Sequence, residues 1–183
     1  MLTAISGNNI MPSVRLFADS FRCNERPMRR QDRCIKDKSV IKEFLDRAQY
    51  GVLALNDNGQ PYAIPLHYGY EWDKELPVFY FHGFTQGRKI DILLKNDTAC
   101  FTLVPSTSII NAKPNNPCSA GARFESVIVE GKAGVVQEEN EKIKGLERIM
   151  DHYEQPTGPF SKGNLNRTYV LKLMVEKLSA KKN

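Results

Sequence analysis

The chain has 183 residues, a mass of 20.8 kDa and a formal net charge of +5, which suits one domain with a hydrophobic core. It has no apolar run of the roughly 20 residues that span a bilayer, and its basic residues lack the interleaved aromatics of single-stranded nucleic-acid platforms. Membrane insertion and nucleic-acid binding are therefore not expected. The absence of a signal-peptide pattern, and four cysteines without a CxxC pair, favour a cytoplasmic protein with reduced thiols.

The first predicted element of regular structure follows an irregular N-terminal extension. Residues 1–27 show no sustained period and are expected to be poorly ordered, which leaves residues 28–183 as the folded domain. Asp37 is a suitable N-cap for a helix that ends near residues 50–51. Its apolar stripe is predicted to comprise Val40, Ile41, Phe44, Leu45 and Ala48.

A hairpin is predicted next. Residues 52–55 and 62–70 form two apolar strands on either side of a tight-turn signal at residues 57–59. Pro65 cannot donate a main-chain hydrogen bond to a ladder, so it marks an edge, a bulge or a kink. A second turn at residues 73–75 leads into a strand over residues 78–84.

Two cations stand where a short helix is predicted to begin, at Arg88 and Lys89 after Gly87. The helix is expected to present Ile90, Leu93 and Leu94 on one face. Because a helix N-terminus carries a partial positive charge, basic residues are disfavoured there unless they share an anion with it. The pattern therefore indicates either a phosphate site or a solvated basic turn.

The rest of the chain continues the β-rich pattern. The predicted segments are strands over residues 98–104, 124–136 and 169–174, a helix over residues 138–153, and loops over residues 105–122 and 154–166. About six strands in hairpin-rich order, with few helices, predict a mainly β fold: an antiparallel barrel with peripheral helices.

Four short motifs carry a resemblance to a known family. They are Met28-Arg29-Arg30-x-Asp32-Arg33, Gly59-x-Pro61-Tyr62-x-x-Pro65-Leu66, Phe79-Tyr80-Phe81-His82-x5-Arg88-Lys89 and Phe124-Glu125-Ser126-Val127-x3-Gly131. Together they resemble the FMN-binding split-barrel superfamily, in the pyridoxamine 5′-phosphate oxidase-related branch that includes nitroimidazole-resistance (Nim-type) proteins. The resemblance runs from about residue 28 to the last strand.

This resemblance implies a six-stranded antiparallel split barrel that forms a homodimer, with FMN at the subunit interface. It also implies a set of cofactor-binding residues. Gly87, Arg88 and Lys89 would hold the phosphate; main chain at Ala63, Ile64, Pro65 and Leu66 would line the flavin ring; Phe81 and His82 would lie near the ring or ribityl chain; and Ser126 would approach the flavin from the partner subunit.

Each of these residues also has a structural interpretation. Residues 63–66 could be an ordinary strand with a proline kink, Ser126 an outward polar residue, and His82 a packed histidine or a proton donor to the reaction. The three histidines have no metal-ligand spacing, so no metal site is predicted. Cys118, in the predicted loop over residues 105–122, could be a reactive thiol or a packed, inert one.

The resemblance implies a flavin-dependent reductase that acts on small electrophiles such as nitroaromatics or quinones. A non-catalytic flavin- or haem-binding protein of the same superfamily is the alternative from another class, and a deazaflavin (F420) enzyme is a third. Residues 175–183 contain neither the arginines nor the histidine that end pyridoxamine phosphate oxidases proper, which argues against vitamin B6 oxidation.

Overall fold

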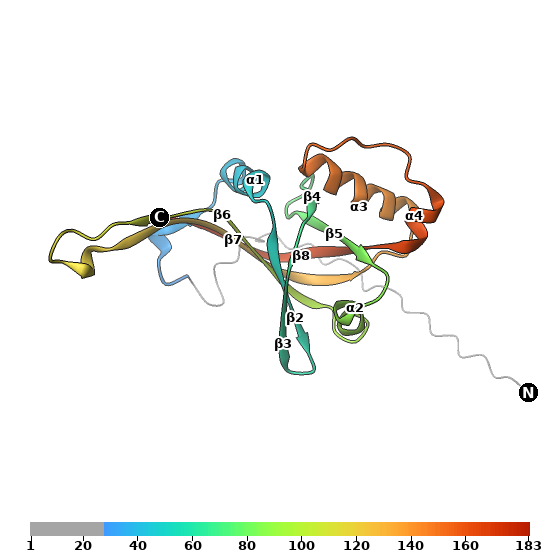
Figure 1. Ribbon diagram of the computed structural model, residues 1–183, viewed down its shortest axis with the longest axis horizontal. Helices are drawn as coiled ribbons and strands as arrows, with labels where there is room; N and C mark the ends of the chain where they lie inside the picture. Colours follow the sequence, from blue (N-terminus) through green and yellow to red (C-terminus); the bar gives the residue numbers. More distant parts are fainter. Residues whose placement is uncertain (1–27) are drawn as a thin grey trace, which may run out of the picture.

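The computed structural model describes residues 28–183, which form one antiparallel sheet of eight strands with helices on its faces (Figure 1). The strand order is β3-β2-β6-β7-β8-β5-β4, and β1 pairs with β8 outside this path. The sheet curves without closing, which confirms the mainly β split-barrel fold. The extension at residues 1–27 lies outside the described residues.

The strands are β1 (Cys34–Ile35), β2 (Gly51–Asp57), β3 (Gln60–Leu66), β4 (Gly69–Glu71), β5 (Val78–Phe84), β6 (Thr98–Ile110), β7 (Gly121–Val135) and β8 (Thr168–Lys182). The α-helices are α1 (Lys38–Arg47), α2 (Arg88–Leu93), α3 (Glu139–His152) and α4 (Lys162–Arg167). Because β1 and β4 have only two and three residues, six longer strands make up most of the sheet, as predicted.

Helix α1 begins where the sequence indicates. The Asp37 carboxylate accepts a hydrogen bond from the Ser39 main-chain N–H at 2.8 Å, which satisfies one of the unpaired donors of the first turn. Ile41, Phe44 and Leu45 are fully or almost fully buried against the sheet. The predicted apolar stripe is therefore the face that packs on the core.

The β2–β3 hairpin closes through Asn58 and Gly59, which both have positive φ (53° and 91°). This is the backbone that the Asn-Gly pair favours at a two-residue turn. β3 is the terminal strand of the sheet path, so Pro65 sits on an edge and the edge prediction is confirmed.

Helix α3 lies unusually close to the sheet because glycines stand at the contact. A Cβ atom on Gly69 of β4 would come within 2.3–2.4 Å of the main chain at Arg148, and one on Gly145 of α3 would come within 2.8 Å of the Tyr80 ring. Leu146 and Ile149 complete this second core layer beside β5. The helix thereby fixes the position of β4 and of the bend that precedes it.

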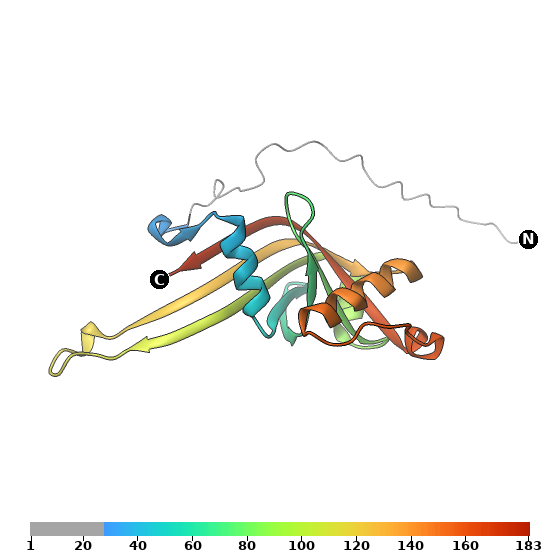
Figure 2. The same ribbon diagram turned by 90° about the horizontal axis from the view of Figure 1, so that it is seen from above.

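Several predicted boundaries were wrong. The predicted strand over residues 62–70 is interrupted, because β3 ends at Leu66 and β4 begins at Gly69, whereas the predicted loops contain more regular structure than expected. The predicted loop over residues 105–122 is mostly strand: β6 continues to Ile110 past a register shift between Leu103 and Ser106, and β7 already begins at Gly121. The Ser/Thr/Ile composition of residues 106–110 suits a strand, and the irregularity absorbs Pro105. Figure 2 shows the resulting hairpin extending beyond the body of the molecule.

The C-terminal part of the chain also contains more regular structure than predicted. The predicted loop over residues 154–166 includes the start of α4, whose N-cap Ser161 accepts from the Asn164 N–H. β8 runs to Lys182, well past the predicted end at residue 174, because the pairing with β7 shifts register after Glu130 and then continues. In α2 the buried residues are Ile92 and Leu93, whereas Leu94 is 73% exposed.

Candidate flavin site

The turn before α2 has a backbone that only glycine adopts readily. Gly87 has φ 141° and ψ 160° and is the N-cap of the helix, and its carbonyl accepts from the N–H groups of Ile90 and Asp91. No side chain caps this helix start. Helix α2 lies beside the β2–β3 hairpin (Figure 1), and the turn brings Arg88 to that hairpin.

Arg88 is held in place by two residues of that hairpin. Its Nε and Nη2 atoms both lie 3.0 Å from Oδ2 of Asp57, and its guanidinium lies 4.7 Å from the centre of the Tyr62 ring. Nη1 has no partner within residues 28–183. Asp57 and Tyr62 thus fix the direction of the guanidinium, and one edge of it stays open to an anion.

Lys89 points toward β8 rather than toward the hairpin. Its Nζ lies 5.4 Å from the centre of the Tyr169 ring of β8. The Tyr169 hydroxyl is buried and has no hydrogen-bond partner in the part of the chain that the structure describes. An orphaned hydroxyl of this kind costs free energy unless a bound group or water satisfies it. The hydroxyl packs beside Gly83, where an added Cβ atom would lie 2.7 Å from it, so the side chains that can take a phosphate here are Arg88 and Lys89.

His82 of β5 lies open to solvent near the same end of the sheet. Partial burial lowers the pKa of His82 most, and the nearby His67 and Lys89 lower it further through charge repulsion. The sequence reasoning did not include His67, which follows β3 directly; its ring packs edge-on to Tyr153 at 5.2 Å. The antiparallel pairing of β4 with β5, in which Gly69 lies opposite Tyr80, brings the two histidines near one another.

The segment predicted to line the flavin ring is the exposed edge strand. Ala63 and Pro65 are exposed, while Ile64 and Leu66 pack partly against the core. Because no strand of residues 28–183 pairs with the outer edge of β3, its main-chain groups are open to a ligand. Phe81, in contrast, is fully buried and stacks edge-on with Phe101 at 4.8 Å, so its side chain faces the core.

Ser126 lies apart from the other predicted residues within one chain. It pairs with Lys181 of β8, near the base of the extended hairpin. Lys132 lies on the same strand and bonds to Asp97, which follows α2. At the usual rise of a strand, the six residues from Ser126 to Lys132 span about 20 Å. Within one chain no contact joins Ser126 to Arg88 or Lys89, and its predicted role is an approach to the flavin from the partner subunit.

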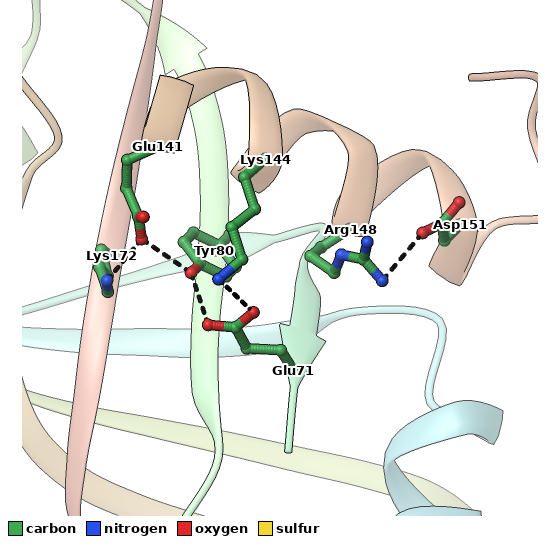
Figure 3. A network of polar contacts seen from close by, with 7 residues as sticks. All are labelled: Glu71, Tyr80, Glu141, Lys144, Arg148, Asp151 and Lys172. Atoms are coloured by element: carbon green, nitrogen blue, oxygen red, sulfur yellow. Dashed lines mark hydrogen bonds and ion pairs between the residues drawn. The ribbon is translucent and has the colours of Figure 1, made fainter. Parts of the chain in front are cut away.

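A separate group of polar residues lies between β4, β5, β8 and α3 (Figure 3). The Tyr80 hydroxyl contacts Glu71 at 3.0 Å and Glu141 at 2.9 Å, and Lys144 and Lys172 pair with these carboxylates. The pKa of Tyr80 is strongly raised, mainly by burial and secondly by the two neighbouring carboxylates. This network holds α3 on the sheet, and no sequence motif indicated it.

A cavity of about 440 Å³ opens beside this network, between α1, β4 and α3. Its lining is Asp46, Tyr70, Glu71, Trp72, Asp73, Lys144, Arg148, Asp151 and His152. None of the residues predicted to bind the flavin lines it. The cavity is therefore distinct from the Arg88–Lys89 site.

The family model described as pyridoxamine 5′-phosphate oxidase matches residues 37–182, which is most of the chain. The chain belongs to this family. No curated protein sequence matches the chain. None of the helices within residues 28–183 is long and apolar enough to cross a membrane.

Solved structures of other proteins share the fold of this chain. A candidate 5-nitroimidazole antibiotic resistance protein from Bacteroides thetaiotaomicron is 28% identical, with a TM-score of 0.69 over 81% of this chain and 85% of that one. A flavocytochrome from Azotobacter vinelandii is 22% identical, with a TM-score of 0.68 over 85% and 72%. An FAD- and haem-binding protein from Mycobacterium smegmatis is 18% identical, with a TM-score of 0.69 over 82% and 73%.

Proposed function

We propose that this protein binds FMN and uses it to reduce small electrophiles such as nitroaromatics or quinones. The observation that carries the proposal is the pair of cations at the start of α2, with the Arg88 guanidinium already oriented by Asp57 and Tyr62. Membership in the pyridoxamine 5′-phosphate oxidase family and the likeness to a candidate 5-nitroimidazole resistance protein support it.

In this proposal each part of the site has one task. Arg88 and Lys89 hold the phosphate, with Asp57 and Tyr62 fixing the guanidinium beforehand. The open edge of β3 orients the ring through main-chain hydrogen bonds. FMN, when bound, supplies the two-electron redox chemistry, so no protein nucleophile is needed.

His82 is the side chain proposed to hold the proton for the reaction. Its lowered pKa keeps the imidazole neutral near pH 7, with one nitrogen able to donate and the other able to accept. A homodimer would complete the site, because Ser126 can approach a flavin only from a second copy. We propose this arrangement on the resemblance and on the separation of Ser126 from Arg88 within one chain.

The phosphate assignment is tested by comparing FMN with riboflavin, which lacks the phosphate. Replacing Arg88 and Lys89 together by Ala should weaken FMN binding at least about 100-fold, since charge-assisted bonds contribute about 1.5–3 kcal/mol each. Riboflavin affinity should change little. Lys95→Ala, an exposed lysine just after α2, is the matched control and should leave both affinities unchanged. Equal loss for the two flavins would contradict the phosphate role.

The absorbance spectrum of the purified protein separates the alternative cofactors. FMN gives bands in the blue and near-ultraviolet, haem a Soret band, and a deazaflavin a single different band. Turnover of a nitroimidazole or quinone by the reduced, FMN-loaded protein then separates a reductase from a flavin-binding protein without activity. A Soret band without flavin absorbance would overturn the proposed function.

A further inference from the structure

The cavity between α1, β4 and α3 has no role in the proposed flavin chemistry. Its volume of about 440 Å³ lies within the range of small-molecule sites, roughly 300–1,000 Å³. Two helices end at this cavity, because Asp46 stands in the last turn of α1 and Asp151 in the last turn of α3. The carboxyl end of a helix carries a partial negative charge, so a carboxylate there is disfavoured unless a cation offsets it. Arg148 offsets Asp151, whereas Asp46 has no ion-pair partner among residues 28–183.

The groups around Asp46 are hydrogen-bond acceptors. The Tyr70 hydroxyl donates to Oδ1 of Asp46 at 2.5 Å, which leaves Oδ2 open. The Nε2 atom of His152 lies 3.1 Å from the Ala48 carbonyl oxygen. Because a carbonyl only accepts, Nε2 carries the hydrogen and Nδ1 of the neutral ring is left as an acceptor. The pKa of His152 is lowered, mainly by burial, which keeps the ring neutral near pH 7. This part of the cavity therefore suits an ammonium group.

Arg148 supplies the opposite chemistry beside these acceptors. It lies one helical turn before His152, on the same face of α3. Its Nη1 atom contacts Asp151 at 3.3 Å (Figure 3), while the edge formed by Nε and Nη2 has no partner in the described part of the chain. This is the edge that forms two parallel hydrogen bonds to a carboxylate. Nε is buried, so the lack of an acceptor costs free energy, and a bound carboxylate would supply one.

The far end of the cavity carries a second carboxylate without a cation. Asp73 stands three residues after Tyr70, at most about 10 Å away at the rise of an extended chain. It has no ion-pair partner in the segment that the structure describes, residues 28–183. Glu71, which lies between them, is paired with Lys144 at 2.6 Å. The cavity lining therefore has two carboxylates in excess of its cations, those of Asp46 and Asp73.

We propose that this cavity binds a free basic amino acid such as L-lysine. The carboxylate of the ligand takes the open edge of Arg148, and its α-ammonium takes the acceptors of Asp46 and His152. The side-chain cation of the ligand pairs with Asp73. A simple amine would leave Arg148 without an acceptor, and an apolar amino acid would leave Asp73 without a cation. A metal ion is not the expected occupant, because no group of three His, Cys, Asp or Glu within residues 28–183 could hold one.

The site needs no flavin, so binding of L-lysine to the full chain is measured by isothermal titration calorimetry without FMN. Two analogues each lack one of the groups: cadaverine lacks the carboxylate, and L-norleucine lacks the side-chain ammonium. The wild-type chain should bind L-lysine saturably and at least about tenfold more tightly than either analogue, since each analogue loses a charge-assisted contact.

Two substitutions should remove these preferences one at a time. Arg148→Met should weaken L-lysine binding about tenfold or more and leave cadaverine binding little changed. Asp73→Asn should weaken binding of L-lysine and cadaverine and leave that of L-norleucine little changed. Glu139→Gln, an exposed acid at the other end of α3, is the matched control and should alter none of the three affinities.

The comparison of the three probes on the wild-type chain needs no variant, so a folding defect cannot leave the proposal undecided. Absence of saturable L-lysine binding, or equal affinity for the three probes, would overturn it. An equal loss for all three probes in Arg148→Met or Asp73→Asn, with thermal melting as in wild type, would also overturn it.

Discussion

The ion pair between Arg47 of α1 and Glu125 of β7 gives a prediction whose size follows from burial. The Arg47 Nη2 and Glu125 Oε2 atoms are 2.5 Å apart, and the Glu125 side chain is only 12% exposed. Lys182 lies 3.2 Å from the other carboxylate oxygen. Arg47→Met keeps the aliphatic stem beside Phe44 but leaves Lys182, which is 56% exposed, as the remaining cation beside the carboxylate.

Breaking a buried pair from one side costs about 3–5 kcal/mol, but Arg47 is 41% exposed and solvent screens part of the interaction. We therefore expect a loss of about 1–3 kcal/mol in the free energy of unfolding at pH 7. For a folded domain of this size that lowers Tm by about 2–12 °C. Thermal melting by circular dichroism measures it.

The loss should depend on pH. Burial opposes ionisation of Glu125, but hydrogen bonds and charge from Arg47 and Lys182 outweigh burial and lower its pKa. A carboxyl with a lowered folded-state pKa contributes stability that is full above its unfolded pKa, near 4.5, and is lost as the pH falls through the folded value. The difference between wild type and Arg47→Met should therefore shrink below about pH 4.

Glu43 provides the control, because it forms an exposed pair with the same arginine at 3.4 Å. Glu43→Gln should change stability by less than about 0.5 kcal/mol. A loss equal to that of Arg47→Met, or a loss that stays the same at pH 7 and at pH 3.5, would refute the assignment of the effect to Glu125.

A chain that begins at Met28 should keep its flavin and its Tm within error, since the family match starts later; a large loss of Tm would show that residues 1–27 stabilise the domain. Gly87→Ala should cost about 1–3 kcal/mol and lower Tm, because φ 141° is strained for any residue with a Cβ atom; an unchanged Tm would show that the turn relaxes. By NMR titration His82 should show a midpoint below 6.5, because burial, His67 and Lys89 disfavour its cation, so its contribution to stability falls as the pH drops through that midpoint. A midpoint above 6.5 would contradict this.

Local signals predicted the fold well where one short motif determines the geometry. The Asn58-Gly59 turn, the Asp37 N-cap and the edge position of Pro65 each depend on the chemistry of one or two residues, and all three were confirmed. The extent of the strands was not predictable in this way. The sequence did not predict strand at residues 106–110 and 175–182. These segments become strand because each of them pairs with β7, which is distant in the sequence.

The candidate site also contains residues that the sequence predicts and residues that only the fold brings together. Gly87, Arg88 and Lys89 are adjacent in the sequence, so their grouping was visible from the start. Asp57 and Tyr169 were not, because they reach the site from β2 and β8, and only the folded sheet brings them to Arg88 and Lys89. No spacing rule links residues that lie more than thirty positions apart.

The position of β8 has a consequence for the order in which this chain can fold. β8 pairs with β7 on one side and β5 on the other, so residues 168–182 join the two halves of the sheet. Until these residues have been synthesised, β5 lacks its main partner strand, and one hydrogen-bonding edge of β7 has no partner. The nascent chain must therefore carry an unpaired β5 edge while residues 85–167 are synthesised. Assembly waits on contacts between segments about 90 residues apart, as between Phe81 and Leu171. Chaperone dependence during synthesis, rather than low final stability, would be the expected weakness of this arrangement.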